Sequence, residues 1–262
     1  MRKAIILCIL VAVLTAATLL SGCEISAPGN VVTAEKDFTN FSFVEVEGTF
    51  EVEITKSDLF SITISADDSF FDYIAVSKEG ETLRIYLNPR HTFTDFTLQA
   101  RILKAEITMP ALYGLQLSGA SQGIVSGFKS LEDFSFDISG ASSVNIVDTE
   151  VGDVAFKVSG SSKITGNMNA EDATFEVSGA NGIELEGSAK NIILNASGAS
   201  KVDLADFPLN DANIKLSGAS EVTVHAKGRL DAALSDASRL NFLGNPTMGN
   251  ISVSGASTIK HK

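Results

Sequence analysis

Two sets of residues in this 262-residue sequence have types and a spacing that could support chemistry. The first is a pair of carboxylates, Glu184 and Asp203, which lie 19 residues apart. If one turn of a repeating fold separates them, they stack about 5 Å apart, as the two carboxylates of a retaining glycosidase do. The second set is a series of serines that recurs through the second half of the chain, each a candidate nucleophile.

Neither set has the neighbours that catalysis requires. A serine nucleophile needs an adjacent base and a group that orients the base, and none of the three histidines, His91, His225 and His261, recurs beside the serines. No long insertion builds a cleft around the carboxylates. Lys201 lies within reach on the same strand face, so an ordinary ion pair is expected there.

We therefore expect no enzyme, no catalytic residue, no cofactor and no metal centre. Glu184 and Asp203 remain the lowest-ranked candidate site, as a polysaccharide-cleaving pair or as ligands for calcium, which prefers oxygen donors.

The serines belong to an internal repeat. The motif Ser-Gly-Ala-Ser, or a near variant, occurs eight times at spacings of 21, 20, 19, 19, 20, 18 and 19 residues. In one copy Asp236 replaces the glycine, and in another Asn181 replaces the final serine. The copies begin with Ser118-Gly119, Ser139-Gly140, Ser159-Gly160, Ser178-Gly179, Ser197-Gly198, Ser217-Gly218, Ser235 and Ser254-Gly255.

Apolar residues alternate before and after each motif with the period of a β-strand, as in Phe134, Phe136 and Ile138 followed by Val144 and Ile146. A period near 19 is too short for a propeller blade and lacks the leucine pattern of leucine-rich repeats. The sequence therefore predicts an all-β fold, a right-handed, single-stranded parallel β-helix (β-solenoid) with coils of about 19 residues.

This fold gives the motif a structural role without chemistry. A solenoid corner brings backbones close together, which favours glycine and small side chains, and stacked serine hydroxyls can bond neighbouring coils. The residues two before each motif alternate in charge from coil to coil, so we expect them to form an ordinary solvated surface. These residues are Gln116, Asp137, Lys157, Glu176, Asn195, Lys215, Ala233 and Ser252.

The amino-terminal segment predicts export. Arg2 and Lys3 precede an apolar run, and Leu20-Ser21-Gly22-Cys23 follows it. This pattern resembles the lipobox of bacterial lipoproteins, in which the cysteine is acylated and becomes the first residue. The alternatives are an uncleaved transmembrane anchor and an ordinary signal peptide. We expect a removed signal peptide (1–22), a lipidated Cys23 with a flexible tether (23–36), and one β-helix domain (37–262).

Within that domain, residues 37–110 are strand-rich but lack the motif, which predicts first coils and a cap, whereas 111–262 form the repeat coils. The formal charge of the chain is −12, which disfavours nucleic-acid binding. Cys8 leaves with the signal peptide and lipid modifies Cys23, so no disulfide forms within one mature chain.

Several segments resemble the head-GIN domain family of auto-transporter adhesins. They are the Gly-x-Phe-x-Val-x-Ile core within 43–54, Leu83-Arg84-Ile85, Met109-Pro110-Ala111-Leu112, the first repeat motif at 115–121 and Gly244-Asn245-Pro246. The resemblance covers nearly all of 37–262. It implies a right-handed β-helix on an exported bacterial protein, and the family's name implies adhesion.

The first expected function is thus an adhesion or ligand-binding module of the cell envelope or surface. Its expected ligand is a glycan or a protein, and lipid on Cys23 would make the membrane its partner. The second is an envelope structural or self-assembling protein, and the third is a polysaccharide-active enzyme. At the carboxyl end, either Lys260, His261 and Lys262 blunt the last coil by charge, or that coil pairs with a second copy in a homodimer.

Overall fold

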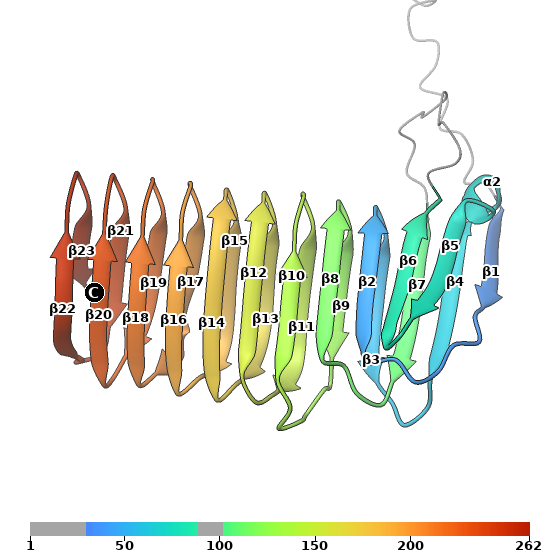
Figure 1. Ribbon diagram of the computed structural model, residues 1–262, viewed down its shortest axis with the longest axis horizontal. Coiled ribbons are helices and arrows are strands. Elements are labelled where there is room, and N and C mark those ends of the chain that lie inside the picture. The colour runs from blue at the N-terminus through green and yellow to red at the C-terminus, as the bar shows by residue number, and fades with distance from the viewer. Residues whose placement is uncertain (1–29, 89–101) are drawn as a thin grey trace, which may run out of the picture.

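The computed structural model describes residues 30–88 and 102–262, which form two β-sheets lying face to face (Figure 1). Among these residues one sheet has 12 strands and the other 11. In the repeat region each coil contributes one strand to the 11-stranded sheet, turns through the Ser-Gly-Ala-Ser motif, and contributes one strand to the 12-stranded sheet. The strands of the 11-stranded sheet here are β8 (Gly114–Gly119), β10 (Phe134–Ile138), β12 (Val154–Gly160), β14 (Asp172–Gly179), β16 (Asn191–Ala196), β18 (Asp211–Leu216), β20 (Arg229–Leu234) and β22 (Thr247–Val253).

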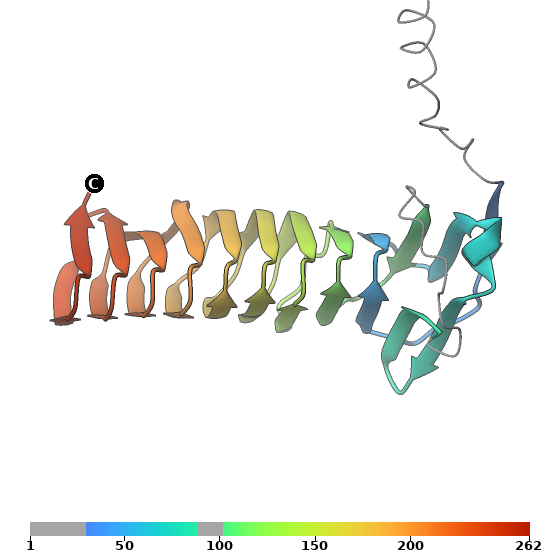
Figure 2. The ribbon, with the colours of Figure 1, turned by 90° about the horizontal axis from the view of Figure 1, so that it is seen from above.

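The partner strands in the 12-stranded sheet run in the same order along the molecule (Figure 2). They are β9 (Gln122–Ser126), β11 (Ser143–Glu150), β13 (Lys163–Asn169), β15 (Gly182–Ser188), β17 (Lys201–Leu209), β19 (Glu221–Ala226), β21 (Arg239–Leu243) and β23 (Thr258–His261). Stacked strands pair in parallel, and equivalent residues are 18 to 21 positions apart outside the irregular pairs. The predicted β-solenoid is therefore confirmed.

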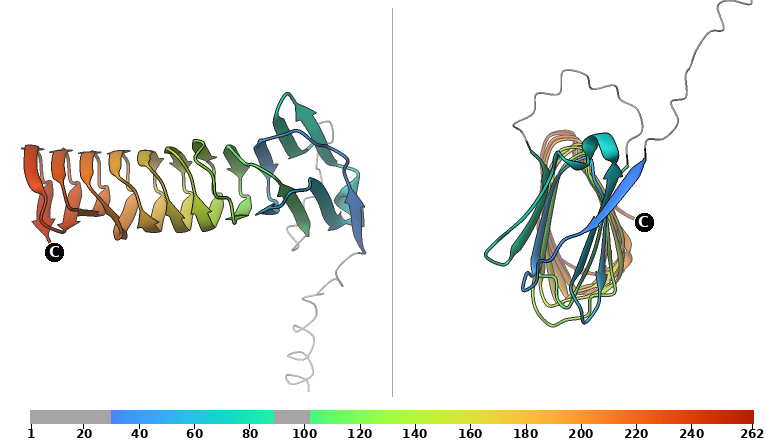
Figure 3. Two further views of the ribbon diagram at one scale, coloured as in Figure 1. Left: turned by 90° about the horizontal axis from the view of Figure 1, so that it is seen from below. Right: turned by 90° about the vertical axis from the view of Figure 1, so that its right-hand side faces the viewer.

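The interior lies between the two sheets, which are seen end-on in Figure 3. Alternate residues of each strand point into it, as the period-two pattern predicts. Phe136, Phe156 and Phe175 occupy one register position in three successive coils and are fully buried. Their rings stack with centroid separations of 5.0 and 4.7 Å. Identical side chains at one register position therefore form a continuous column along the core.

The amino-terminal part departs from a simple sequence of coils. Strand β2 lies between β6 and β8, and β3 lies between β7 and β9, so the first coil in the chain is an inner coil of the stack. Antiparallel strands β1, β4 and β5, with the short helix α2, cover this end (Figure 3). The elements are β1 (Val31–Glu35), β2 (Phe43–Gly48), β3 (Glu51–Lys56), β4 (Ser61–Asp67), α2 (Asp68–Phe71), β5 (Ile74–Glu79), β6 (Thr82–Leu87) and β7 (Leu103–Met109).

The turn of each coil depends on its glycine. Gly160 has φ +79°, a left-handed conformation that costs other residues about 1–2 kcal/mol. A Cβ at this position would lie 2.3 Å from the carbonyl oxygen of Gly140 in the preceding coil. That same oxygen accepts a 2.7 Å hydrogen bond from the backbone N–H of Ser161. The glycine thus permits both the dihedral angle and the close stacking of backbones.

The other motif glycines share this geometry. In the copy in which Asp236 replaces the glycine, an additional hydrogen bond compensates for the strained backbone. Asp236 also has a positive φ, +64°, and its carboxylate accepts a 3.0 Å hydrogen bond from the backbone N–H of Gly218 in the preceding coil. The glycines with positive φ in this column are Gly119, Gly140, Gly160, Gly179, Gly198, Gly218 and Gly255.

At the carboxyl end of the stack, inward-facing side chains of β22 are exposed. Met248, Ile251 and Val253 continue the register of the buried β20 residues but are 45%, 38% and 43% exposed. His261 stacks on Phe242 at 4.8 Å, and its Nε2 lies 2.8 Å from the carbonyl oxygen of Gly244. The apolar interior therefore reaches the surface here.

Candidate ligand-binding face

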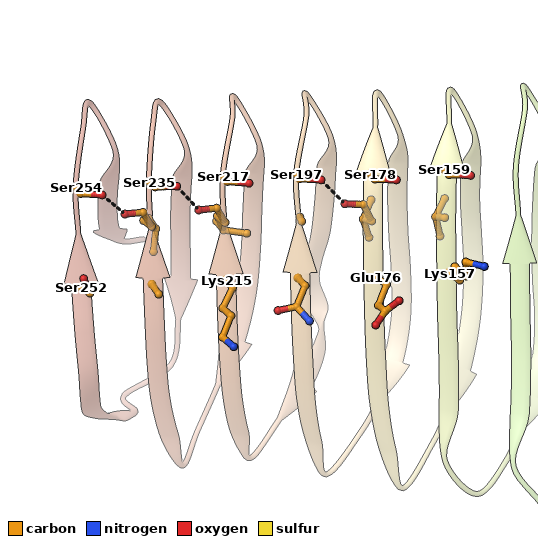
Figure 4. Close-up of a pocket in the computed structure, with 17 residues that line it drawn as sticks. Lys157, Ser159, Glu176, Ser178, Ser197, Lys215, Ser217, Ser235, Ser252 and Ser254 are labelled. Carbon is orange, nitrogen blue, oxygen red and sulfur yellow. Dashed lines mark hydrogen bonds between the residues drawn. The ribbon is translucent and has the colours of Figure 1, made fainter.

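The two serines of each motif lie in different environments. The first lies at the surface, where the hydroxyl of Ser197 donates to the carbonyl oxygen of Val177 at 3.4 Å and that of Ser254 donates to Leu234 at 3.2 Å (Figure 4). The final residue of the motif is buried in seven copies. These buried residues are Ser121, Ser142, Ser162, Asn181, Ser200, Ser220 and Ser238.

The buried residues stabilise the turn. The hydroxyl of Ser200 donates to the carbonyl oxygen of Gly179 at 3.1 Å and accepts from the backbone N–H of Asn181 at 3.3 Å. A buried backbone group left without a partner costs about 1–3 kcal/mol. The sequence predicts that stacked serine hydroxyls bond neighbouring coils, and the alternation of the last motif residue with the apolar positions is the signal that this residue is the buried one.

No serine of the repeat has the arrangement of a nucleophile in the described part of the chain. The Nδ1 of His225 lies 3.2 Å from the carbonyl oxygen of Ala205, and the Nε2 of His261 contacts Gly244. His91 lies outside the described residues.

The carboxylates of Glu184 and Asp203 are register partners on the outer face of β15 and β17. Asp203 accepts a 3.2 Å hydrogen bond from the backbone N–H of Ala205, and Glu184 is exposed. Lys201, which we expected to pair with them, forms no ion pair with either carboxylate within the described chain, so that expectation is wrong. The two side chains lie on an open sheet face.

Two shallow hollows lie on the outer face of the opposite, 11-stranded sheet. One hollow of about 550 Å³ runs over β2, β8, β10, β12 and β14, and a second of about 620 Å³ runs from β12 to β22. The two share Lys157 and Glu176, so they form one groove, which we call the sheet groove. The first serines of the motifs form one margin of it (Figure 4).

The polar side chains along the sheet groove include the column of alternating charges for which the sequence predicts an ordinary solvated surface. In register across the strands, the column reads Arg84, Glu45, Gln116, Asp137, Lys157, Glu176, Asn195, Lys215, Ala233 and Ser252.

Four of the six charged residues in this column form ion pairs. Arg84 contacts Glu45 at 2.9 Å, and Lys157 contacts Asp137 at 3.3 Å. The hydrogen bond that Arg84 donates to the carboxylate of Glu45 raises the pKa of Arg84 above its ordinary value.

An aromatic ring lies at one end of the sheet groove. Phe43 of β2 points outward and is 36% exposed. A Cβ on its register partner Gly114 would lie 2.7 Å from the ring, so the absence of a side chain there lets the ring lean across β8. Tyr113 meets the ring edge-on, with centroids 6.4 Å apart. The sequence does not predict this pair, because β2 and β8 become neighbours only through the altered order of coils.

Cys23, the predicted lipidation site, lies outside the described residues. Within the described residues no helix has the length and apolar character to cross a membrane. The same residues contain no group of three or more His, Cys, Asp or Glu side chains placed to hold a metal ion.

The fold and the grooved face define a β-solenoid repeat protein with a capped amino-terminal end. The chain belongs to the family described as "Putative auto-transporter adhesin, head GIN domain", whose model matches residues 40–246. This confirms the resemblance drawn from the sequence motifs.

Solved structures share the fold. A structure described as a putative adhesin from Parabacteroides merdae is 16% identical, with a TM-score of 0.81, and the match covers 89% of this chain and 98% of that one. A putative lipid binding protein from Parabacteroides distasonis is 19% identical with a TM-score of 0.76, over 89% and 97% of the two chains. A putative adhesin from the same species is 16% identical with a TM-score of 0.80, over 89% and 98%. No match was found among curated proteins.

Proposed function

We propose that this protein is an exported adhesion module, anchored by lipid on Cys23, that binds a surface ligand in the sheet groove without transforming it. The observation that carries this proposal is the groove itself, which consists of two adjoining shallow hollows across successive coils of one sheet. Large grooves with a few polar groups are the usual form of ligand sites. The adhesin names of the family and of two structural relatives support the same function.

The geometry of the polar residues supports binding over catalysis. The groove presents hydroxyls, amides and paired charges spread evenly over many coils. Catalysis requires a nucleophile, base and orienting group gathered at one point. An extended ligand instead gains from many weak contacts distributed along its length.

Lipid anchoring gives a direct prediction. When the full chain is recovered from bacterial membranes, its intact mass should correspond to a protein that begins at Cys23 and carries several acyl chains, because one chain alone anchors only marginally. Replacing Cys8 by Ser, within the predicted signal peptide, should leave this mass unchanged. A mature protein with an unmodified Cys23 would contradict the lipid anchor.

The binding function is tested by applying the full chain, purified in detergent, to immobilised bacterial and host polysaccharides and matrix proteins. We expect saturable binding to at least one of them, and no binding by a heat-denatured sample. A folded sample that binds none of these surfaces would overturn the proposed function.

Self-assembly is a second candidate function, favoured by the exposed Met248, Ile251 and Val253 at the edge of the last coil. An unpaired edge strand with apolar side chains pairs readily with another copy. This alternative predicts a homodimer in analytical ultracentrifugation, dissociated by Val253→Lys. A wild-type protein that stays monomeric at all concentrations would remove the alternative.

A further inference from the structure

We infer that the ligand of the sheet groove is an extended, uncharged polysaccharide strand, which runs along the solenoid axis and stacks one sugar on Phe43. This inference rests on the proposed binding function and names its ligand class. Three features of the groove carry it: the aromatic ring at one end, the neutrality of its charges, and its regular spacing.

The ring of Phe43 forms a stacking platform. Gly114 lets the ring lean over β8, Tyr113 supports its edge, and more than a third of the residue remains exposed. Thr82, Ser135 and Gln116 surround it as hydrogen-bonding groups in the same hollow. The C–H face of a pyranose packs against an electron-rich ring face, while its hydroxyls need such polar neighbours.

The charges of the groove select an uncharged ligand. The chain as a whole carries −12, whereas the charged residues that line the groove are two bases, Lys157 and Lys215, and three acids, Glu45, Asp137 and Glu176. Arg84 lies beside the groove and pairs with Glu45 at 2.9 Å, which balances the third acid. An anionic polymer finds no cationic excess here, and a cationic peptide finds no anionic excess. Charge complementarity therefore favours a neutral polymer.

The hydrogen bonding and spacing of the strands favour a sugar chain over a peptide. Strands β8 to β20 each have a neighbour on both sides, so their backbones offer no free edge for strand addition by a peptide. Coils stack about 4.8 Å apart, close to the length of one pyranose unit in an extended chain. Successive sugars can therefore meet successive coils in nearly the same way.

The test measures binding of the full chain, purified in detergent, by calorimetry. The probes are neutral hexasaccharides (cellohexaose, laminarihexaose and mannohexaose), the anionic hexagalacturonic acid, and fibronectin. We expect one or more neutral hexasaccharides to bind, with affinity falling about 10-fold in Phe43→Ala because the stacking contact is lost. Phe43→Tyr keeps the ring and should bind within about twofold of wild type. Glu184→Gln, on the opposite sheet, should bind as wild type does.

The outcomes separate the two proposals. If a folded Phe43→Ala variant binds the neutral hexasaccharides as tightly as wild type does, the proposed stacking of a sugar on Phe43 is wrong. Binding of hexagalacturonic acid or fibronectin alone would overturn the ligand class but leave the binding function intact. A folded chain that binds none of the probes would overturn the ligand class, and it would overturn the binding function as well if the same sample also bound none of the immobilised polysaccharides and matrix proteins. Melting temperatures of the variants confirm that each sample is folded.

Discussion

Replacing Gly160 by Val should lower the stability of the solenoid by about 2–5 kcal/mol. A valine at φ +79° is strained, and its Cβ would lie 2.3 Å from the carbonyl oxygen of Gly140. The backbone must move to relieve this overlap, which disturbs the 2.7 Å bond from Ser161 to Gly140. Urea denaturation of the full chain, followed by circular dichroism, measures the loss.

Two other glycines provide matched controls. Gly80 has φ +60°, but a Cβ at this position would have no neighbouring atom within 4 Å, so Gly80→Ala measures the dihedral strain alone. Gly182 has neither a positive φ nor a close neighbour, so Gly182→Ala should change stability by less than about 0.5 kcal/mol. Gly160→Val could lower the free energy of unfolding by no more than Gly80→Ala does. That result would contradict the view that close stacking of backbones at the turn requires a glycine.

Replacing Phe156 by Ala should cost about 3–5 kcal/mol, the usual loss for a buried phenylalanine. Its ring stacks between Phe136 and Phe175 at 5.0 and 4.7 Å. Removing the ring opens a cavity in the middle of the column. It also weakens the contacts of this coil with the coils of Phe136 and Phe175, and in a solenoid each coil is stabilised only by its neighbours.

The matched control for this substitution is Ile193→Ala. Ile193 lies on the outer face of the nearby strand β16 and is 50% exposed, so its truncation should cost less than about 0.5 kcal/mol. Denaturation midpoints of the two variants provide the comparison. Equal losses would contradict the division of the strands into inner and outer faces.

The repeat coils could be predicted from the sequence because several constraints agree there. In 134–138, a shift of the register by one residue would move Phe134, Phe136 and Ile138 to solvent, so one register is strongly preferred. The recurring glycine then places a turn after every such strand. The repeat period, the alternation of apolar residues and the recurring turn together predict a solenoid.

The first coil could not be placed in the same way. Its turn lacks the Ser-Gly-Ala-Ser motif, yet Gly48 takes the glycine position. The oxygen of Gly48 accepts a 2.7 Å bond from Ala120 and lies 2.3 Å from where a Cβ of Gly119 would be. These contacts, together with the parallel pairing of the two strands, make β2 and β8 neighbours. Nothing in the order of the chain reveals that the coil of β2 and β3 lies between two later ones.

The sheet groove was missed for a related reason. Its residues alternate in charge, as a solvated surface does, and the pattern carries no information on whether the face is hollowed. Phe43 and Gly114 are 71 residues apart, and their contact depends on the unexpected order of coils. Sequence periodicity predicts which side chains face outward, whereas the shape of the outer face depends on side-chain sizes across several strands.

The chain contains no tryptophan, which permits a direct test of where the ligand binds. Phe43→Trp places a single tryptophan in the sheet groove, and Glu184→Trp places one on the opposite sheet. Tryptophan emission of each full-length variant is recorded during titration with cellohexaose, laminarihexaose or mannohexaose. We expect a saturable blue shift for Phe43→Trp and no change for Glu184→Trp. A response from Glu184→Trp alone would contradict the assignment of ligand binding to the groove.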